Sequence, residues 1–173
     1  MVPNAVIYLI GVIAWTFLEY LIHAWLSHTF NTFVTPLHAV HHRDPHAVFA
    51  VGAWLPIALT WSGGIILFGP VPAMLFYSGI VTGFILYEVA HYRIHFAEPA
   101  NRLEAYLRTR HLVHHRCAPD ACHGVTSALW DLVFGSEPMG DAMRSMSATV
   151  ATVPPLAGPS NLRRLLRRGI PAV

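Results

Sequence analysis

The sequence predicts an all-α protein embedded in a membrane, and three observations support this. Apolar residues make up 54% of the 173 residues and charged residues only 12%, with a mean hydropathy of +0.47. A soluble chain of this composition has too few polar residues to cover its surface, whereas a surface that faces lipid needs none. Three apolar runs have the length of membrane spans, and histidines gather at their ends. We therefore expect about three transmembrane helices with a histidine-rich dimetal site at one membrane surface, capped by short helices.

The first apolar run extends from about Ala5 to Leu26 and is long enough to span a hydrocarbon core of about 30 Å. Glu19 and His23 are its first polar residues. A loop is expected from Asn31 to Pro36. His23 and His28 are five positions apart, a spacing that does not stack on one face of an α-helix. We therefore expect this helix to end or distort between the two histidines.

A second apolar run extends from Ala47 to Phe68 and a third from Ala73 to Ala90. The turn between them, Gly69 to Pro72, is so short that the two runs must form an antiparallel hairpin. The third run continues as a polar helix through His91 and His95.

Basic residues are placed asymmetrically along the chain. All eleven are arginines, and none precedes Arg43 or lies between Arg43 and Arg93. Because arginine accumulates on the cytoplasmic side of membrane proteins, the histidine-bearing ends of the helices are predicted to face the cytoplasm. We expect an integral protein of a bacterial inner membrane. Met1 to Asn4 lack the positive charge of a secretory signal, so the first run is expected to be retained as a membrane segment.

The later part of the chain predicts shorter elements. Glu98 to Arg110 has the pattern of an amphipathic surface helix. Ala128 to Phe134 is too short to span a membrane and predicts an interfacial or packing helix, capped by Thr126 or Ser127. Cys117 and Cys122 could form a disulfide or join a zinc site, but we expect free thiols without a ligand role.

The membrane domain is expected to cover residues 1–139. Residues 140–173 are expected to form a loosely ordered tail. The segment from Gly140 to Pro159 is rich in alanine, threonine, proline and glycine. This composition predicts a loosely ordered segment. Asn161 to Arg168 predicts a short basic amphipathic helix that could meet anionic headgroups. A frayed basic tail is the alternative, because an isolated helix of this length is marginal.

Ten of the twelve histidines fall into four clusters near the ends of the predicted helices. They are His23 and His28; His38, His41 and His42; His91 and His95; and His111, His114 and His115. In the two triplets the spacing i, i+3, i+4 directs three imidazoles from one face of a helix. One ion with four to six ligands needs far fewer than ten imidazoles, so two metal ions are predicted.

The simpler interpretation of each single histidine is a hydrogen-bonding residue at a membrane interface. Ten such residues at one boundary would require many coincidences, because a buried imidazole without partners is costly. His46 and His123 lie outside the clusters, and we expect them to be loop residues or residues that support the ligands without binding metal.

Three carboxylates are expected to support the ligands. Glu19 precedes His23 by four residues and Glu88 precedes His91 by three, so each could accept the ring N–H that does not face the metal. Asp131 is also expected beside the site. The alternative for these acids is helix capping or a salt bridge with a nearby arginine.

With these clusters the sequence resembles the fatty acid hydroxylase superfamily, also called the sterol desaturase family, whose members carry histidine boxes in this order and spacing. It is most similar to the fatty acid 2-hydroxylase branch, in which a signature of the same kind follows the last box. That signature is present here as Gly124-Val125-Thr126-Ser127, Trp130-Asp131 and Phe134-Gly135-Ser136, with serine in place of the final threonine. The resemblance covers roughly Glu19 to Ser136.

The resemblance implies a membrane oxygenase with two metal ions, iron in the active form and in some members zinc as isolated. Such an enzyme uses dioxygen and two electrons to hydroxylate an unactivated C–H bond of a lipid, here most simply a fatty acyl chain. A separate electron donor of the ferredoxin or cytochrome b5 type is expected, and no nucleic acid partner.

Two alternatives remain at this point. The substrate could instead be a carotenoid or a sterol, with hydroxylation or desaturation as the outcome. The chain could also be a membrane metal- or haem-binding protein without enzymatic activity. Haem would need only two axial histidines, and its intense Soret band would distinguish it from a dimetal site.

Overall fold

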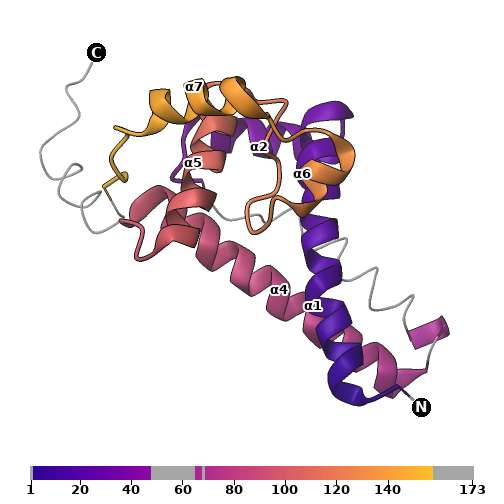
Figure 1. Ribbon diagram of the computed structural model, residues 1–173. Coiled ribbons are helices and arrows are strands. Elements are labelled where there is room, and N and C mark those ends of the chain that lie inside the picture. The colour runs from indigo at the N-terminus through magenta and orange to yellow at the C-terminus, as the bar shows by residue number, and fades with distance from the viewer. Residues whose placement is uncertain (1, 48–64, 68, 158–173) are drawn as a thin grey trace, which may run out of the picture.

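A computed structural model describes residues 2–47, 65–67 and 69–157 of the chain. Across these ranges all regular structure is helical, which confirms the predicted all-α class. Figure 1 shows the shorter helices gathered at one end of two long helices, α1 and α4, which cross each other. The elements in chain order are α1 Asn4–Tyr20, the π-helix η1 Leu21–Thr29, α2 Val34–Arg43, α4 Pro70–Phe96, α5 Arg102–Arg116, α6 Leu129–Phe134 and α7 Gly140–Val150.

Two continuous helical segments are long and apolar enough to cross a membrane. One is the 26-residue segment Asn4–Thr29, formed by α1 and η1, and the other is the 27-residue helix α4. At 1.5 Å per residue α4 is about 40 Å long, which exceeds a hydrocarbon core of about 30 Å. These segments correspond to two of the three predicted spans. The remaining predicted span is the second apolar run, Ala47 to Phe68. It lies outside the described residues except for Ala47 and residues 65–67.

Glycines allow α1 and α4 to approach each other backbone to backbone. A Cβ atom on Gly79 would lie 2.1 Å from the carbonyl oxygen of Tyr8, and one on Gly11 would lie 2.2 Å from that of Phe76. Neither contact leaves room for any side chain. The hydroxyl of Tyr8 also donates to Thr82 Oγ1 across the crossing, at 2.9 Å. The two helices are therefore fixed against each other below their histidine-bearing ends.

An aromatic cluster lies between this crossing and the histidines. Trp15 of α1 is 2% exposed, and its ring centroid is 5.1 Å from that of Phe84 and 5.9 Å from that of Tyr87 on α4. The Tyr87 centroid is in turn 5.4 Å from that of His91. Apolar rings therefore separate the histidines from the glycine contact.

Helix α5 begins with a side-chain cap and carries the last histidine cluster at its other end. The side chain of Asn101 accepts a hydrogen bond from the N–H of Glu104 at 2.9 Å, which satisfies a free donor of the first turn. The surface helix predicted for Glu98 to Arg110 thus begins slightly later and continues to Arg116. At the short helix α6, the hydroxyl of Ser127 accepts from the N–H of Leu129 at 3.1 Å.

The expectation of a loosely ordered tail from Gly140 was wrong over Gly140–Val150, which forms helix α7. Met143, Met146 and Val150 pack against a buried cluster that includes Val113 of α5, and Val150 is only 1% exposed. The overall composition of this segment obscured its apolar positions at i, i+3 and i+7. The basic helix predicted for Asn161 to Arg168 lies outside the described residues.

Candidate metal centre

The π-helix η1 places His23 and His28 on one face of the first long helix. Residues five positions apart align in a π-helix, and the ring centroids of these two histidines are 5.3 Å apart. Hydroxyl groups reinforce the wider turn, because Ser27 donates to the carbonyl of Ile22 and Thr29 to that of Ala24, each five residues earlier. The predicted distortion between the two histidines is therefore confirmed as a π-helical turn.

Five imidazoles from three parts of the chain converge beside η1. We call them the first group: His23, His28, His38, His42 and His114. One nitrogen of each lies within 4.8 Å of the others. Four of the Nε2 atoms form a closed ring, in which the neighbouring separations are 3.1, 2.8, 3.0 and 3.0 Å.

A second set of five imidazoles lies at the end of α4. We call it the second group: His41, His91, His95, His111 and His115. The Nε2 atom of His91 lies 3.0 Å from those of His41 and His111, and the Nε2 atoms of His111 and His95 are also 3.0 Å apart. All ten histidines of the four predicted clusters belong to one of the two groups. Helices α2 and α5 contribute to both.

The separations between the nitrogens fit ligands of a single ion in each group. Two ligands about 2.1 Å from one ion are about 3.0 Å apart when they meet at a right angle, and about 3.4 Å apart at the tetrahedral angle. The observed separations of 2.8 to 3.1 Å match the right angle. The donor set therefore suits ions with five or six ligands better than a four-coordinate structural zinc site.

Hydrogen bonding alone cannot satisfy this arrangement. The Nε2 atom of His38 lies within 3.1 Å of three other Nε2 atoms, those of His23, His28 and His42. A neutral imidazole nitrogen is either a donor or an acceptor, so it can bond with at most one of them in a regular geometry. A cation at the centre would convert the converging lone pairs from a repulsive contact into coordination.

The imidazoles outside the long helices are held in the neutral form that metal binding requires. Burial, together with neighbouring imidazoles, lowers the pKa of His38 to about 2 and that of His41 to about 4. Burial likewise lowers the pKa of His111 and His114 well below its ordinary value. Their lone pairs are therefore free for a cation at neutral pH.

Glu19 does not accept the ring N–H of His23, so this predicted contact was wrong. The Nδ1–H of His23 instead donates to the carbonyl oxygen of His123. The carboxylate of Glu19 accepts from the backbone N–H groups of Val125 and Thr126, at 2.5 and 2.9 Å, and from the Thr126 hydroxyl. Glu19 therefore fixes the loop whose carbonyl oxygen accepts from His23, and it does not bind the His23 ring itself.

The predicted bond between Glu88 and His91 is also not made. Among the described residues, His91 Nδ1 has no hydrogen-bond partner. Asp131 acts near the site as Glu19 does: it is fully buried and accepts from the backbone N–H groups of His123 and Gly124, both at 2.8 Å. Asp131 therefore orients the loop that provides the oxygen for His23.

A buried ion pair holds Asp131. The guanidinium of Arg110 is 0% exposed and donates to Asp131 Oδ2 and Glu137 Oε2, each at 2.6 Å. Burial alone would raise the pKa of Asp131, but contacts from His123 and Ser136 and the charge of Arg110 lower it below its ordinary value. The carboxylate of Asp131 is thus ionised. Its charge is balanced by Arg110, which directly precedes the ligand His111 in the chain.

The two histidines outside the clusters differ from each other. His46 is exposed, with Nδ1 2.9 Å from Asp44 Oδ1. His123 is 5% exposed, its ring lies beside the first group, and its carbonyl oxygen accepts from His23, which agrees with the expectation of a loop residue that supports the ligands. Cys117 and Cys122 are free thiols, and neither belongs to the two groups.

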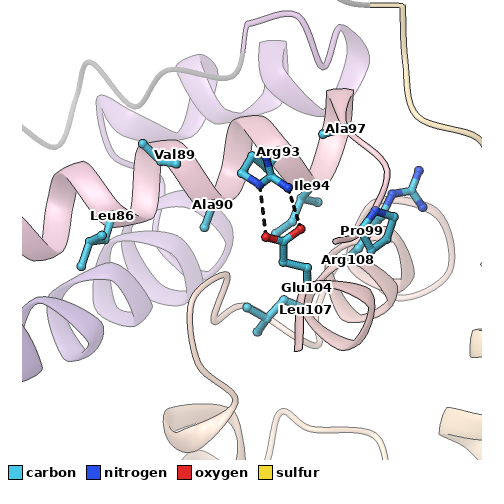
Figure 2. Close-up of a pocket in the computed structure, with 10 residues that line it drawn as sticks. All are labelled: Leu86, Val89, Ala90, Arg93, Ile94, Ala97, Pro99, Glu104, Leu107 and Arg108. Atoms are coloured by element: carbon cyan, nitrogen blue, oxygen red, sulfur yellow. Dashed lines mark hydrogen bonds and ion pairs between the residues drawn. The ribbon is translucent and has the colours of Figure 1, made fainter. Parts of the chain in front are cut away.

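A mainly apolar pocket lies between α4 and α5, close to the second group. Val89, Ala90 and Leu107 line it, and the ion pair of Arg93 with Glu104 borders its polar side. Figure 2 shows this pair bridging the two helices. Its two nitrogen–oxygen distances are 3.2 and 2.8 Å. The pocket thus combines an apolar wall on a membrane-length helix with a polar rim.

Long apolar helices that carry histidine boxes to a shared centre define a class of helical membrane-associated proteins. Within that class, the family model for fatty acid hydroxylases matches residues 8–136. The chain belongs to the fatty acid hydroxylase family.

Similar proteins agree with this assignment. A dihydroceramide fatty acyl 2-hydroxylase of Arabidopsis thaliana is 32% identical over 149 residues, which cover 80% of this chain and 63% of the relative. A fatty acid 2-hydroxylase of Mus musculus is 26% identical over 162 residues, covering 78% of this chain and 41% of the relative. The solved structure of full-length scs7p, with only its hydroxylase domain visible, has a TM-score of 0.72 at 25% identity and covers 80% of this chain and 58% of that chain. The chain therefore matches no more than about two thirds of the length of these proteins.

Proposed function

We propose that the chain is a membrane-bound dimetal oxygenase, with iron in its active form, that hydroxylates an unactivated C–H bond of a fatty acyl chain. The reaction consumes dioxygen, two electrons and two protons, and produces one hydroxyl group and one water molecule. The observation that carries the proposal is the convergence of ten imidazoles into two five-nitrogen groups. The names of the similar proteins support an acyl chain as the substrate.

Each group would hold one ion through its five imidazoles. When bound, the two ions supply the redox chemistry of dioxygen, which no side chain of the protein can provide. Five ligands leave one position free on a six-coordinate ion. Zinc could occupy the same nitrogens in the isolated protein.

The protein's own residues orient the imidazoles and exclude water. His23 donates from Nδ1 to the carbonyl of His123, and His114 donates from Nδ1 to the carbonyl of Ala121 at 2.8 Å. Each bond fixes the tautomer in which Nε2 carries the lone pair toward the centre. His111 and His114 are 1% and 0% exposed, so bulk water is kept from these ligands.

The pocket between α4 and α5 is suited to receive the acyl chain. Leu107 lines it and precedes His111 by four residues on α5, so the pocket lies on the face of α5 that bears a ligand of the second group. Val89 of α4 is 52% exposed, which lets the pocket communicate with lipid if α4 spans the membrane. The Arg93–Glu104 pair at the polar rim would lie near the headgroup level.

We place the centre on the cytoplasmic side and propose a separate electron donor of the ferredoxin or cytochrome b5 type. The seven arginines of the described ranges support this orientation, because each lies on, or at the end of, an element at the histidine end of the fold (Figure 1). A basic surface there would attract an acidic donor protein. The bacterial inner membrane stays a prediction from the sequence.

Lipid analysis of a host with and without the chain tests the proposal. We expect acyl chains with a mass gain of one oxygen atom only where the chain is expressed, and no such product with His91→Ala. His46→Ala, which alters an exposed histidine outside both groups, serves as the matched control and should give full product. Absence of any oxygenated lipid from cells that contain metal-loaded wild-type protein and a suitable donor would refute the hydroxylase function.

A further inference from the structure

The chain after α7 folds back onto α4 and α5, which carry four of the five second-group histidines. Residues 153–157, which we call the strap, follow α7 and run past α5 to the end of α4 (Figure 1). The backbone N–H of Leu156 donates to the carbonyl oxygen of His95 at 2.7 Å, and Arg108 Nη2 donates to that of Val153 at 3.0 Å. The strap therefore joins α4 to α5 by one hydrogen bond to each helix.

The bond to α4 is made at a ligand residue. His95 lies in the last turn of α4, where the carbonyl groups have no partner within the helix. Leu156 supplies the donor for this carbonyl and so fixes the backbone of His95. The Nε2 atom of His95 lies 3.0 Å from that of His111. A movement of the strap would thus move a nitrogen of the second group.

The bond to α5 uses a buried arginine. Arg108 is 9% exposed and precedes His111 by three residues, about one helical turn. Its guanidinium donates to a backbone carbonyl, whereas that of Arg110 meets two carboxylates. Burial of a charge is costly unless the charge makes hydrogen bonds, so the bond to Val153 offsets part of that cost. Val153 also packs against the apolar cluster under α5, which holds its carbonyl in place.

The two histidine groups differ in what orients their imidazoles. In the first group, the Nδ1 atoms of His23 and His114 donate to backbone carbonyls. In the second group, the Nδ1 atoms of His91 and His111 have no hydrogen-bond partner within the described residues. These two imidazoles depend on the positions of α4 and α5 for their orientation. The strap ties these helices together, as does the ion pair beside the pocket.

We propose that the strap is a latch for the second ion, with Arg108 as the positioning residue that keeps it closed. The inference rests on the proposed two-ion centre, but not on lipid hydroxylation. While the strap is bound, His95 and His111 stay together and the second ion leaves slowly. Loss of the Arg108 bond lets the ends of α4 and α5 separate more often, so this ion leaves faster. The first ion should be retained as before, because His23 and His114 have carbonyl partners of their own.

Release of Co²⁺ into excess chelator, from full-length protein in detergent without lipid, tests this latch. His114→Ala removes a first-group ligand and should leave the ion of the second group, whereas His91→Ala should leave that of the first. Arg108→Met, which keeps the length of the side chain but not its donors, is added to each. It should accelerate release from the His114→Ala protein about tenfold and alter its visible Co²⁺ spectrum. Release from the His91→Ala protein should be unchanged. Because Arg108 also lines the pocket, metal release is measured rather than activity.

Two further variants distinguish the hydrogen bond from general packing. Arg108→Lys keeps a donor toward Val153 and should restore slow release, which lost packing alone would not predict. Arg102→Met changes an exposed arginine at the start of the same helix and should alter release in neither protein.

The outcomes separate the latch from the metal centre. If Arg108→Met leaves release from the His114→Ala protein unchanged, or accelerates release equally in both proteins, the latch is refuted while the two-ion centre stands. If Arg108→Met misfolds, Leu156→Pro replaces it, because proline lacks the N–H that binds His95, and the same selective acceleration is expected. A wild type that holds fewer than two Co²⁺ ions overturns the two-ion centre itself, and the latch with it.

Discussion

The Nδ1 atom of His23 lies 2.5 Å from the carbonyl oxygen of His123, although the two residues are 100 positions apart in the chain. This bond fixes an imidazole of the first long helix through the loop that follows α5. Asp131 holds the same loop by its backbone N–H groups, and Arg110 holds Asp131. The geometry of the first group therefore depends on an ion pair that belongs to neither histidine group.

Asp131→Asn tests this dependence. The change removes the charge opposite the buried Arg110, and breaking a buried pair typically costs about 3–5 kcal/mol. We expect a loss near 3 kcal/mol, because Glu137 still contacts the guanidinium. The free energy of unfolding in detergent measures the effect. Asp141→Asn is the control, because its partner Arg144 is exposed, and it should cost less than about 0.5 kcal/mol. Equal losses in both variants would contradict a structural role for the buried pair.

Gly79→Ala is expected to separate the two long helices. The new Cβ atom would meet the backbone oxygen of Tyr8 at 2.1 Å, and a backbone atom cannot rotate away as a side chain can. Overpacking of this kind costs about 1–3 kcal/mol. Thermal unfolding should therefore occur at lower temperature, with weaker metal retention. Ser78→Ala changes the adjacent exposed residue and should leave both unaltered. An unchanged Tm in Gly79→Ala would show that the helices do not need this close contact.

Stability should fall as the pH is lowered below about 6.5. In the unfolded chain an imidazole binds its proton as the pH falls through about 6.5. In the folded protein burial keeps the pKa of His41 at about 4 and that of His38 at about 2. The unfolded state then binds more protons, so the free energy of unfolding decreases from pH 6.5 toward pH 4. Tm values of metal-free protein between pH 8 and pH 5 check this. A Tm that is constant or rises on acidification would contradict buried neutral imidazoles.

Ala90→Phe should obstruct the pocket between α4 and α5 without disturbing the metal ions. If the acyl chain is held there, we expect kcat/KM to fall about tenfold, equivalent to about 1.4 kcal/mol. Metal content should stay at the wild-type level. Ile85→Phe alters an exposed position of α4 outside the pocket and is the matched control. Full activity of Ala90→Phe on long acyl chains would exclude this pocket as the substrate path.

The histidine positions could be predicted from the sequence because their spacing is a local property of a helix. The spacing of His23 and His28 even predicted the distortion that the π-helix provides. The carboxylates could not be assigned in this way. Glu19 was paired with the histidine four residues later, whereas its partner in the fold is Val125, 106 positions away. Such long-range contacts depend on how the loop between α5 and α6 packs against the first long helix, which no local pattern records.

His123 also shows that contacts near the site depend on the fold and not on the local sequence. Nothing in its neighbouring residues indicates which ligand it supports, because it stands alone outside the boxes. Only the folded loop brings its ring to the first group. Likewise, the apolar positions of α7 were masked by alanine and threonine, although Met143 and Met146 lie at helical spacing and face the cluster under α5.

Elemental analysis of the purified protein and of His114→Ala tests the two-ion centre most directly. His114 Nε2 lies 3.0 Å from the Nε2 atoms of both His23 and His42, so its loss removes a ligand from the middle of the first group. We predict two ions per chain in the wild type, about one in His114→Ala, and no hydroxylated lipid from the variant. Two ions and full product formation in His114→Ala would contradict the shared centre.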